Sequence, residues 1–436
     1  MRKVIKPHTL EKRQTTPLFF MSSIFRQVIL LVSLSVCCLP SYAQTIVSEH
    51  IKPKNLKPNN LTTVNANLPD ITPRAGGLKP SNNYANTSYF YKGQDYGSES
   101  QFGPLNVFMN VGFVVPGRLT TTPNLGDIQY KAGWDNVTDS LSHQDDVFDE
   151  SGGFGRSLEK EFIPFAHPSG AWLPNYSLHF LGEGMLSRKL EEYFRYNGMQ
   201  GEYTPKILAV STVIASQLMN EVVEYELPWE QRLDIVADFY FNIAGIIAFS
   251  FDGFAEYFSN DTIQYHYWPG QPVVDTDNGA LFNQGESYFL RIASGAQSGW
   301  KYAFATGMPA NGFGVSMPLD DVEGDYLTVM LGSDVLIPKR DYEQDENDQR
   351  SGDFVAADIA KEYTAAVNVY WDRKGSLMAS SAFSFSPSWQ LNMNLYPEKR
   401  WGMDVGIGGY LVLAEEGANT IGLTFDLMSL VPGFRY

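Results

Sequence analysis

The feature that most constrains this chain is an alternation of apolar and polar residues close to its end, over residues 420–427. The apolar positions are Ile421, Leu423, Phe425 and Leu427. The positions between them are Thr420, Gly422, Thr424 and Asp426. Successive side chains of a β-strand point to opposite faces, so the pattern predicts a strand with one apolar and one polar face. In a soluble sheet the apolar face meets a core; in a transmembrane barrel it meets lipid.

The beginning of the chain has the pattern of an export signal. Arg26 precedes an apolar run, residues 28–36, which is followed by the small-residue cleavage pattern Ser41-Tyr42-Ala43. We therefore expect residues 1–43 to be a signal peptide and the mature chain to start near Gln44. The alternatives are a start at Met21 and a lipid anchor on Cys37.

The terminal stretch resembles the assembly signal of Gram-negative outer-membrane β-barrel proteins. The residues that carry the resemblance are Gly422, Phe425, Leu427 and Tyr436. The resemblance identifies no specific functional family. It implies a barrel in the cell outer membrane, with membrane lipid as a partner and with the barrel-assembly machinery as a partner during biogenesis.

The charge and cysteine content exclude several classes of protein. Removing residues 1–43 takes away six of the 32 basic and one of the 49 acidic residues, which leaves a formal charge of −22. Nucleic acid requires a basic face, so we expect no nucleic-acid partner. The two cysteines, Cys37 and Cys38, lie in the signal, so a disulfide framework or a thiolate metal site is not expected in the mature chain.

We divide the chain into five segments. Residues 1–43 are the signal peptide, and 44–82 are a flexible periplasmic leader rich in Pro, Asn, Lys and Thr. Residues 83–171 should hold the first barrel strands, at Ser88–Tyr91 and Leu105–Val115, and a long acidic loop. Residues 172–258 form a helical insert, and 259–436 hold the remaining strands, ending in the closing strand.

The helical insert is predicted from apolar residues at helical spacing. The first helix covers Tyr176–Tyr196. Thr204-Pro205 begins the second, because Thr is a good cap and Pro is favoured at the first helical position. Pro228 ends that helix, and the third runs from Trp229 through Phe249.

Alternating segments after residue 288 predict a mainly β fold with an α-helical insert, an antiparallel transmembrane β-barrel of about 10–12 strands. A soluble β-sandwich would show the same alternation and is the alternative. Small or amide residues on the polar faces favour the barrel. Aromatic residues near the strand ends suit the interfacial girdles of such barrels. They are Trp371, Trp389, Tyr396, Trp401 and Tyr410.

The helical insert also concentrates acidic residues at helical spacings. The candidate cluster is His179, Glu183, Glu221, Glu224, Asp234 and Asp238. Carboxylates and histidines that project inward from several helices can hold a divalent metal. The alternative is that these acids cap helices, pair with basic residues such as Arg188 or Arg232, or face water.

Two classes of function remain. The first is an envelope protein with a structural, transport or scaffold role, whose helices act as a plug or docking surface; it needs no cofactor. The second is an outer-membrane enzyme that acts on envelope lipid through a metal in the acidic cluster. The sequence contains no Gly-x-Ser-x-Gly, phosphate-loop or His-Glu-x-x-His motif. Catalytic residues therefore cannot be assigned, and the first class is favoured.

Overall fold

The computed structural model describes a unit within residues 88–435. The gaps in this range are residues 115–124, 127, 164–174, 226–231, 278, 283–284, 297, 309, 320–323, 336–362, 386–388, 399–404, 416–418 and 427–430. The signal peptide, the leader, Leu427 and Tyr436 lie outside the described residues.

The first half of this unit is helical. Its α-helices are α2 (Pro104–Gly112), α3 (Tyr130–Ser142), α4 (Gln144–Glu150), α5 (Phe154–Ser157), α6 (Glu183–Tyr196), α7 (Thr204–Glu224), α8 (Arg232–Phe249) and α9 (Asp252–Tyr257). A 3₁₀ turn covers Gly97–Gln101, and π-helical turns cover Leu158–Phe162 and Leu178–Gly182. Among the described helices α7 alone is long and apolar enough to cross a membrane. However, 61% of its apolar 18-residue stretch is buried within the protein. It packs here as a core helix.

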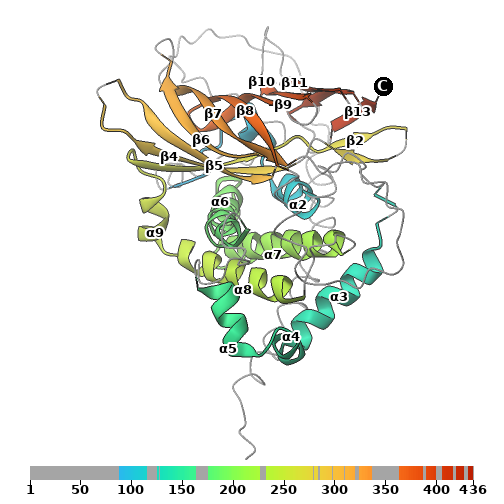
Figure 1. Ribbon diagram of the computed structural model, residues 1–436. Coiled ribbons are helices and arrows are strands. Elements are labelled where there is room, and N and C mark those ends of the chain that lie inside the picture. The colour runs from blue at the N-terminus through green and yellow to red at the C-terminus, as the bar shows by residue number, and fades with distance from the viewer. Residues whose placement is uncertain are drawn as a thin grey trace, which may run out of the picture. The chain divides into compact units, whose positions relative to one another are not determined.

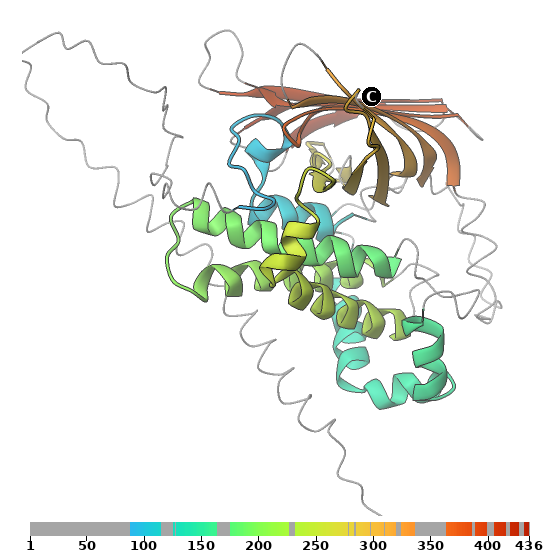
Figure 2. The same cartoon turned by 90° about the vertical axis from the view of Figure 1, so that its left-hand side faces the viewer.

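The second half forms one sheet. Its strands are β1 (Ile263–Pro269), β2 (Val273–Asp275), β3 (Leu281–Phe282), β4 (Glu286–Ala293), β5 (Lys301–Met308), β6 (Ala310–Pro318), β7 (Asp325–Val335), β8 (Tyr363–Arg373), β9 (Ser376–Phe385), β10 (Trp389–Glu398), β11 (Ile407–Ala414), β12 (Thr420–Phe425) and β13 (Val431–Arg435). The order across the sheet is β1-β4-β5-β6-β7-β8-β9-β10-β11-β12-β13-β2-β3. The sheet lies on one side of the helices, with α2 beside it and α3–α5 on the far side (Figures 1 and 2).

The sheet curls so that its two ends approach each other at one corner. β1 and β3 stand at opposite ends of the strand order, and no pairing among the described residues joins them, so the sheet is not closed. However, β1 ends at Pro269 and β2 begins at Val273, a separation of at most about 14 Å. Between them the buried Gln271 side-chain nitrogen lies 3.2 Å from the Leu395 carbonyl on β10 and 3.3 Å from the Gly409 carbonyl on β11.

Apolar side chains cover the outer face of the sheet from β5 to β13. One cross-strand row on this face consists of Tyr302, Val315, Val329, Val369, Ser381, Met393, Leu411, Ile421 and Phe434. A second row consists of Phe304, Phe313, Leu331, Val367, Phe383, Leu391 and Leu413. Many of these side chains are open to solvent, with exposed fractions of 65% for Phe313 and 58% for Leu331.

The inner face is buried and largely polar. Its buried polar residues include Ser316, Thr328, Asn368, Asn392, Thr420 and Thr424. At its centre the Arg291 guanidinium pairs with Asp372 at 3.0 Å and donates to the Ser316 hydroxyl at 2.9 Å. An aromatic group consisting of Trp268, Phe289, Tyr370 and Tyr396 fills the space beside this ion pair. The polarity of this sheet is therefore the reverse of a soluble sheet, in which the apolar face is the buried one.

The helices cover the outer face of β1 and β4. Tyr265, Tyr267 and Tyr288 from these strands share one buried cluster with residues of α2, α6 and α7. The ring of Tyr288 lies against Gly182, where a Cβ atom would come within 2.8 Å of it. The uncovered outer face therefore begins at β5.

The structure corrects the prediction for residues 83–171. The expected strand at Leu105–Val115 is wrong, because α2 occupies it: Pro104 begins the helix, and the buried Val107 and Val111 are one helical turn apart. Ser88–Tyr91 is not a strand either; its backbone N–H groups bind the Glu192 carboxylate. The predicted acidic loop contains α3, α4 and the start of α5, whose acids lie on exposed faces.

The alternation in residues 420–425 is confirmed, but its role as the last strand is wrong. Ile421 and Leu423 are 48% and 59% exposed, while Thr420 and Thr424 are buried. β13 follows this strand and pairs with β12 on one side and with β2, in parallel, on the other. The sequence pattern did not predict β13, because this strand contains Pro432 and Gly433 and both residues are unfavourable inside strands.

The mainly β fold with a helical part is confirmed, whereas the described strand count exceeds the expected range of about 10–12. The sheet contains thirteen described strands. The short strands β2 and β3, and β13, carry little or no alternation, so the sequence pattern did not indicate them. The helices precede the described strands, so they form an amino-terminal layer and not an insert between strands.

Helix α8 crosses the π-helical turn at Leu178–Gly182 at close range. On α8, a Cβ atom at Gly245 would lie 2.0 Å from the backbone oxygen of Phe180. We expect Gly245→Ala to lower the free energy of unfolding by about 1–3 kcal/mol, because the backbone must move apart. Gly253→Ala on α9, which meets nothing within 4 Å, is the matched control and should be neutral or slightly stabilising. Equal midpoints of urea unfolding for the two variants would contradict the close approach of α8 to Phe180.

Candidate functional site

The structure separates most residues of the predicted acidic cluster. His179 and Asp238 meet: the His179 Nε2 atom is 3.4 Å from Asp238 Oδ1, and its Nδ1 atom is 3.1 Å from Asn242 Oδ1. Asn175 donates a further hydrogen bond to Asp238 at 3.0 Å. Burial lowers the pKa of His179 to about 4, although the hydrogen bond to Asn242 opposes this shift. The imidazole is therefore neutral at neutral pH.

Asp234 belongs to a different network. The Tyr176 hydroxyl lies 3.3 Å from Asp234 Oδ1 and donates to Glu161 Oε2 at 2.5 Å. Glu161 also pairs with Lys160 at 2.8 Å. Burial, and then the negative charge of Glu161, raise the pKa of Asp234 to about 7. This group is a set of interhelical hydrogen bonds that Tyr176 holds together.

Glu183 faces the sheet and not the other acids. The Tyr288 hydroxyl on β4 lies 2.6 Å from Glu183 Oε1 and 3.0 Å from Glu286 Oε2. Burial raises the pKa of Glu183 to about 7, although its hydrogen bonds to Tyr288 and Gln217 oppose this. The two carboxyl groups and one phenol thus form a buried polar link between α6 and the sheet.

A π-helical turn explains why His179 and Glu183 separate. Residues four apart share a face of a regular α-helix, which is what the sequence predicted. The turn at Leu178–Gly182 is π-helical, and its wider spacing rotates Glu183 away from His179. As a result His179 faces α8 and Glu183 faces β4.

The remaining two acids lie on α7. Glu221 is buried, and Glu224 accepts a hydrogen bond from Asn220 at 2.6 Å. Across the described residues, no three His, Cys, Asp or Glu side chains are grouped so that they could hold a metal ion. The metal in the acidic cluster stays a hypothesis without support from this geometry.

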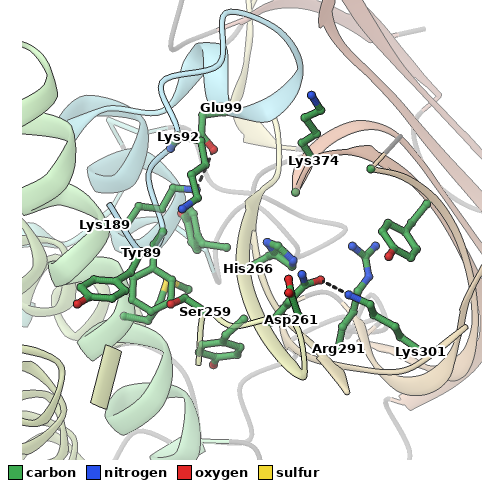
Figure 3. A pocket seen from close by; sticks show the side chains of 18 residues that line it. Tyr89, Lys92, Glu99, Lys189, Ser259, Asp261, His266, Arg291, Lys301 and Lys374 are labelled. Atoms are coloured by element: carbon green, nitrogen blue, oxygen red, sulfur yellow. Dashed lines mark hydrogen bonds and ion pairs between the residues drawn. The ribbon is translucent and has the colours of Figure 1, made fainter. Parts of the chain in front are cut away.

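A second polar site lies where the helices meet the sheet. A cavity of about 270 Å³ is lined by residues from the segment before α2, from α6, β1, β4 and β5, and from the turn between β8 and β9. Its cationic side chains are Lys92, Lys189, Arg291, Lys301 and Lys374. Figure 3 shows His266 between two groups, with Lys92, Lys189 and Glu99 on one side and Arg291 and Lys301 on the other.

Sequence reasoning missed this cationic site and the role of Glu286. Arg291, Lys301 and Glu286 are charged residues within otherwise apolar or small strand segments, and such interruptions were the available signal. Their partners lie far away along the chain; for example, 81 positions separate Arg291 from Asp372. Local spacing could not join them.

Comparisons with family models, with curated proteins and with solved structures find no match to this chain.

The raised pKa of Glu183 predicts a pH-dependent stability. Between its ordinary pKa of 4.5 and about 7, the folded protein keeps a proton that the unfolded chain has lost, so stability falls as pH rises through this range. At about 1.4 kcal/mol per pKa unit the loss is about 3 kcal/mol. His179 and Asp234 also change stability over this range, so the test compares urea unfolding of the wild type and of Glu183→Gln near pH 5 and near pH 8. The variant should lose less stability, or gain more, than the wild type as pH rises.

The control for this experiment is Asp145→Asn, which removes an exposed acid on α4. It should leave the difference between the two pH values unchanged. An unchanged pH dependence in Glu183→Gln would exclude a proton on this carboxyl group.

Proposed function

We propose that this chain is an outer-membrane envelope protein with a structural or scaffold role, whose curled sheet contacts lipid from β5 to β13. The observation that carries the proposal is the reversed polarity of the sheet. Apolar side chains such as Phe313 and Leu423 are 65% and 59% exposed, while polar ones such as Thr424 and Asn368 are buried. A β-barrel in a membrane has this distribution.

The extent of the apolar face supports lipid as its partner. The two cross-strand rows contain no charged residue over the described parts of β5 to β13. Soluble monomers rarely expose apolar patches larger than several hundred Å², so a surface that spans nine strands requires a cover. The export signal and the terminal resemblance expected from the sequence favour lipid over a second protein. The sheet would close further in the membrane, because lipid offers no partner to free backbone groups.

The arrangement of the layers favours a scaffold over a channel. The α-helices pack on the outer side of β1 and β4, as Tyr288 shows, and on Leu281 of β3. The 3₁₀ turn at Gly97–Gln101 lies against the start of β9, where the backbone N–H of Glu99 donates to the Ser376 hydroxyl at 3.1 Å. The inside of the sheet holds the Arg291–Asp372 pair, Gln271 and the aromatic group around Trp268. We therefore infer that the helical layer serves as a docking surface. No contact among the described residues favours the lipid-modifying enzyme.

Of the residues predicted to form an aromatic girdle, some lie on the outer face of the sheet and others do not. Trp389 at the beginning of β10 is 40% exposed on the outer face, as a girdle residue should be. Tyr396 and Tyr410 are buried inside the sheet, so that part of the prediction is wrong. Trp401 lies outside the described residues.

Charge on the apolar face should prevent membrane insertion. We expect Leu331→Lys to reduce the mature protein recovered in the outer-membrane fraction, because a basic residue near the bilayer midplane costs about 2–4 kcal/mol. Ile207→Lys is the matched control: Ile207 is also apolar and 48% exposed, but it lies on α7 in the helical layer. This variant should fractionate normally. Wild-type protein in the soluble periplasmic fraction would exclude the proposal.

Lipid contact can also be measured directly, because a chain that begins at Gln44 contains no cysteine. A fluorophore on Leu331→Cys should be quenched by brominated lipid and not by aqueous iodide. The same fluorophore on Ser142→Cys, an exposed position on α3, should show the opposite response. If neither reagent quenches the Leu331→Cys probe and the protein is dimeric, a second copy covers this face and the lipid proposal fails.

A further inference from the structure

The cavity between the helices and the sheet has an excess of positive charge in a strongly acidic protein. Five lysine and arginine side chains line it, against two carboxylates, Glu99 and Asp261. The whole chain carries a formal charge of −17. Cations that are removed from water are costly unless an opposite charge compensates them.

Two of these cations have an acidic partner. Arg291 is neutralised by Asp372, which does not line the cavity. The Lys189 ammonium lies 3.5 Å from Glu99 Oε2, and Glu99 Oε1 accepts from the backbone N–H of Gly93 at 3.1 Å. These contacts compensate the negative charge of Glu99, which is the buried acid on the helical side of the cavity.

Lys301 has no acidic partner. Its side chain is 9% exposed, and its ammonium donates to the neutral Gln264 Oε1 at 2.9 Å and lies 5.2 Å from the centre of the Tyr326 ring. It forms no ion pair in the described part of the chain, although the negative charges of Asp261 and Asp372 lie near enough to favour its charged form. Arg291 lies over the same ring at 4.6 Å, so two cations share this wall of the cavity.

His266 adds a free hydrogen-bonding group beside these cations. Its Nε2 atom is buried and has no hydrogen-bond partner among the described residues. The ring is stacked on Trp268, with planes 12° apart. Gly375 lies against it, because a Cβ atom there would be 2.8 Å from Cε1. The imidazole is thus held in place with one nitrogen available to a ligand.

We propose that this cavity binds a phosphate group between Lys301 and His266, with Lys92 and Lys374 adding to the positive field. A phosphate dianion has several acceptor oxygens, so it can bind the Lys301 ammonium and the His266 ring together. A single carboxylate would have fewer acceptors for donors that approach from different elements. The aromatic rings of Tyr89 and Tyr326 also line the cavity and suit the carbon skeleton of a small phosphomonoester.

The volume limits the ligand. At about 270 Å³ the cavity lies just below the usual range of about 300–1,000 Å³ for drug-sized ligands. It therefore suits inorganic phosphate, a small phosphomonoester, or the phosphate headgroup of a lipid. The inference does not depend on membrane insertion, since the site can be tested on purified protein in detergent.

The test is a calorimetric titration of the detergent-purified protein with inorganic phosphate and with glycerol 3-phosphate. A parallel experiment detects phosphatidic acid retained from mixed micelles by mass spectrometry. We expect Lys301→Met to weaken binding about tenfold or more, whereas Lys301→Arg retains it. Lys131→Met, which removes an exposed lysine on α3, should bind as the wild type does.

The arms of this experiment distinguish the source of the phosphate. Binding of glycerol 3-phosphate indicates a soluble phosphomonoester or a free headgroup, and retention of phosphatidic acid alone indicates a lipid. Circular dichroism checks that Lys301→Met is folded; if it is not, His266→Phe, which keeps the stacking on Trp268, replaces it. Absence of binding to the wild type at a Kd of about 1 mM or tighter, or equal binding by the folded variants, would overturn the proposal.

Discussion

The reversed polarity of the sheet is the constraint on which the rest of the structure depends. When apolar residues face outward, the inside must accommodate polar side chains, and buried polar groups require partners. Arg291 meets this requirement through Asp372, Ser316 and Thr328, which come from three other strands. Each contact joins strands that are not neighbours in the sheet, so the interior network holds the curl as well as neutralising the charge.

The curl and the helical layer also limit the exposure of the two end strands of the sheet. An open strand edge exposes unpaired backbone groups and invites aggregation. At one end, β1 and β4 are covered by the helical layer through Tyr265 and Tyr288. At the other end, β3 has only two residues. The segment from Pro269 to Val273 connects these ends, and Gln271 binds backbone carbonyls of β10 and β11 on the way.

Polar groups gather at the junction between the two layers. Glu183 from α6 shares the Tyr288 hydroxyl with Glu286 from β4, and the cationic cavity places Lys189 from α6 in the same space as Lys301 from β5. The helices contribute to the burial of these groups because they cover β1 and β4. A ligand with negative charge at this junction would therefore bind to both layers and strengthen their association.

Local sequence patterns determined much of this structure. The alternation at Ile421 and Leu423, and the helix start at Thr204-Pro205, depend on residues within a few positions, and both elements formed. The predicted cap did not: Tyr203 occupies the cap position, and no side chain caps this helix. Only the tertiary structure decided that β13 pairs with β2 and that the acidic cluster divides into separate networks. These outcomes depend on contacts such as that between Glu183 and Tyr288, 105 positions apart. Residue spacing reports the direction of a side chain within its own element, but the partner it meets is determined by how distant elements pack.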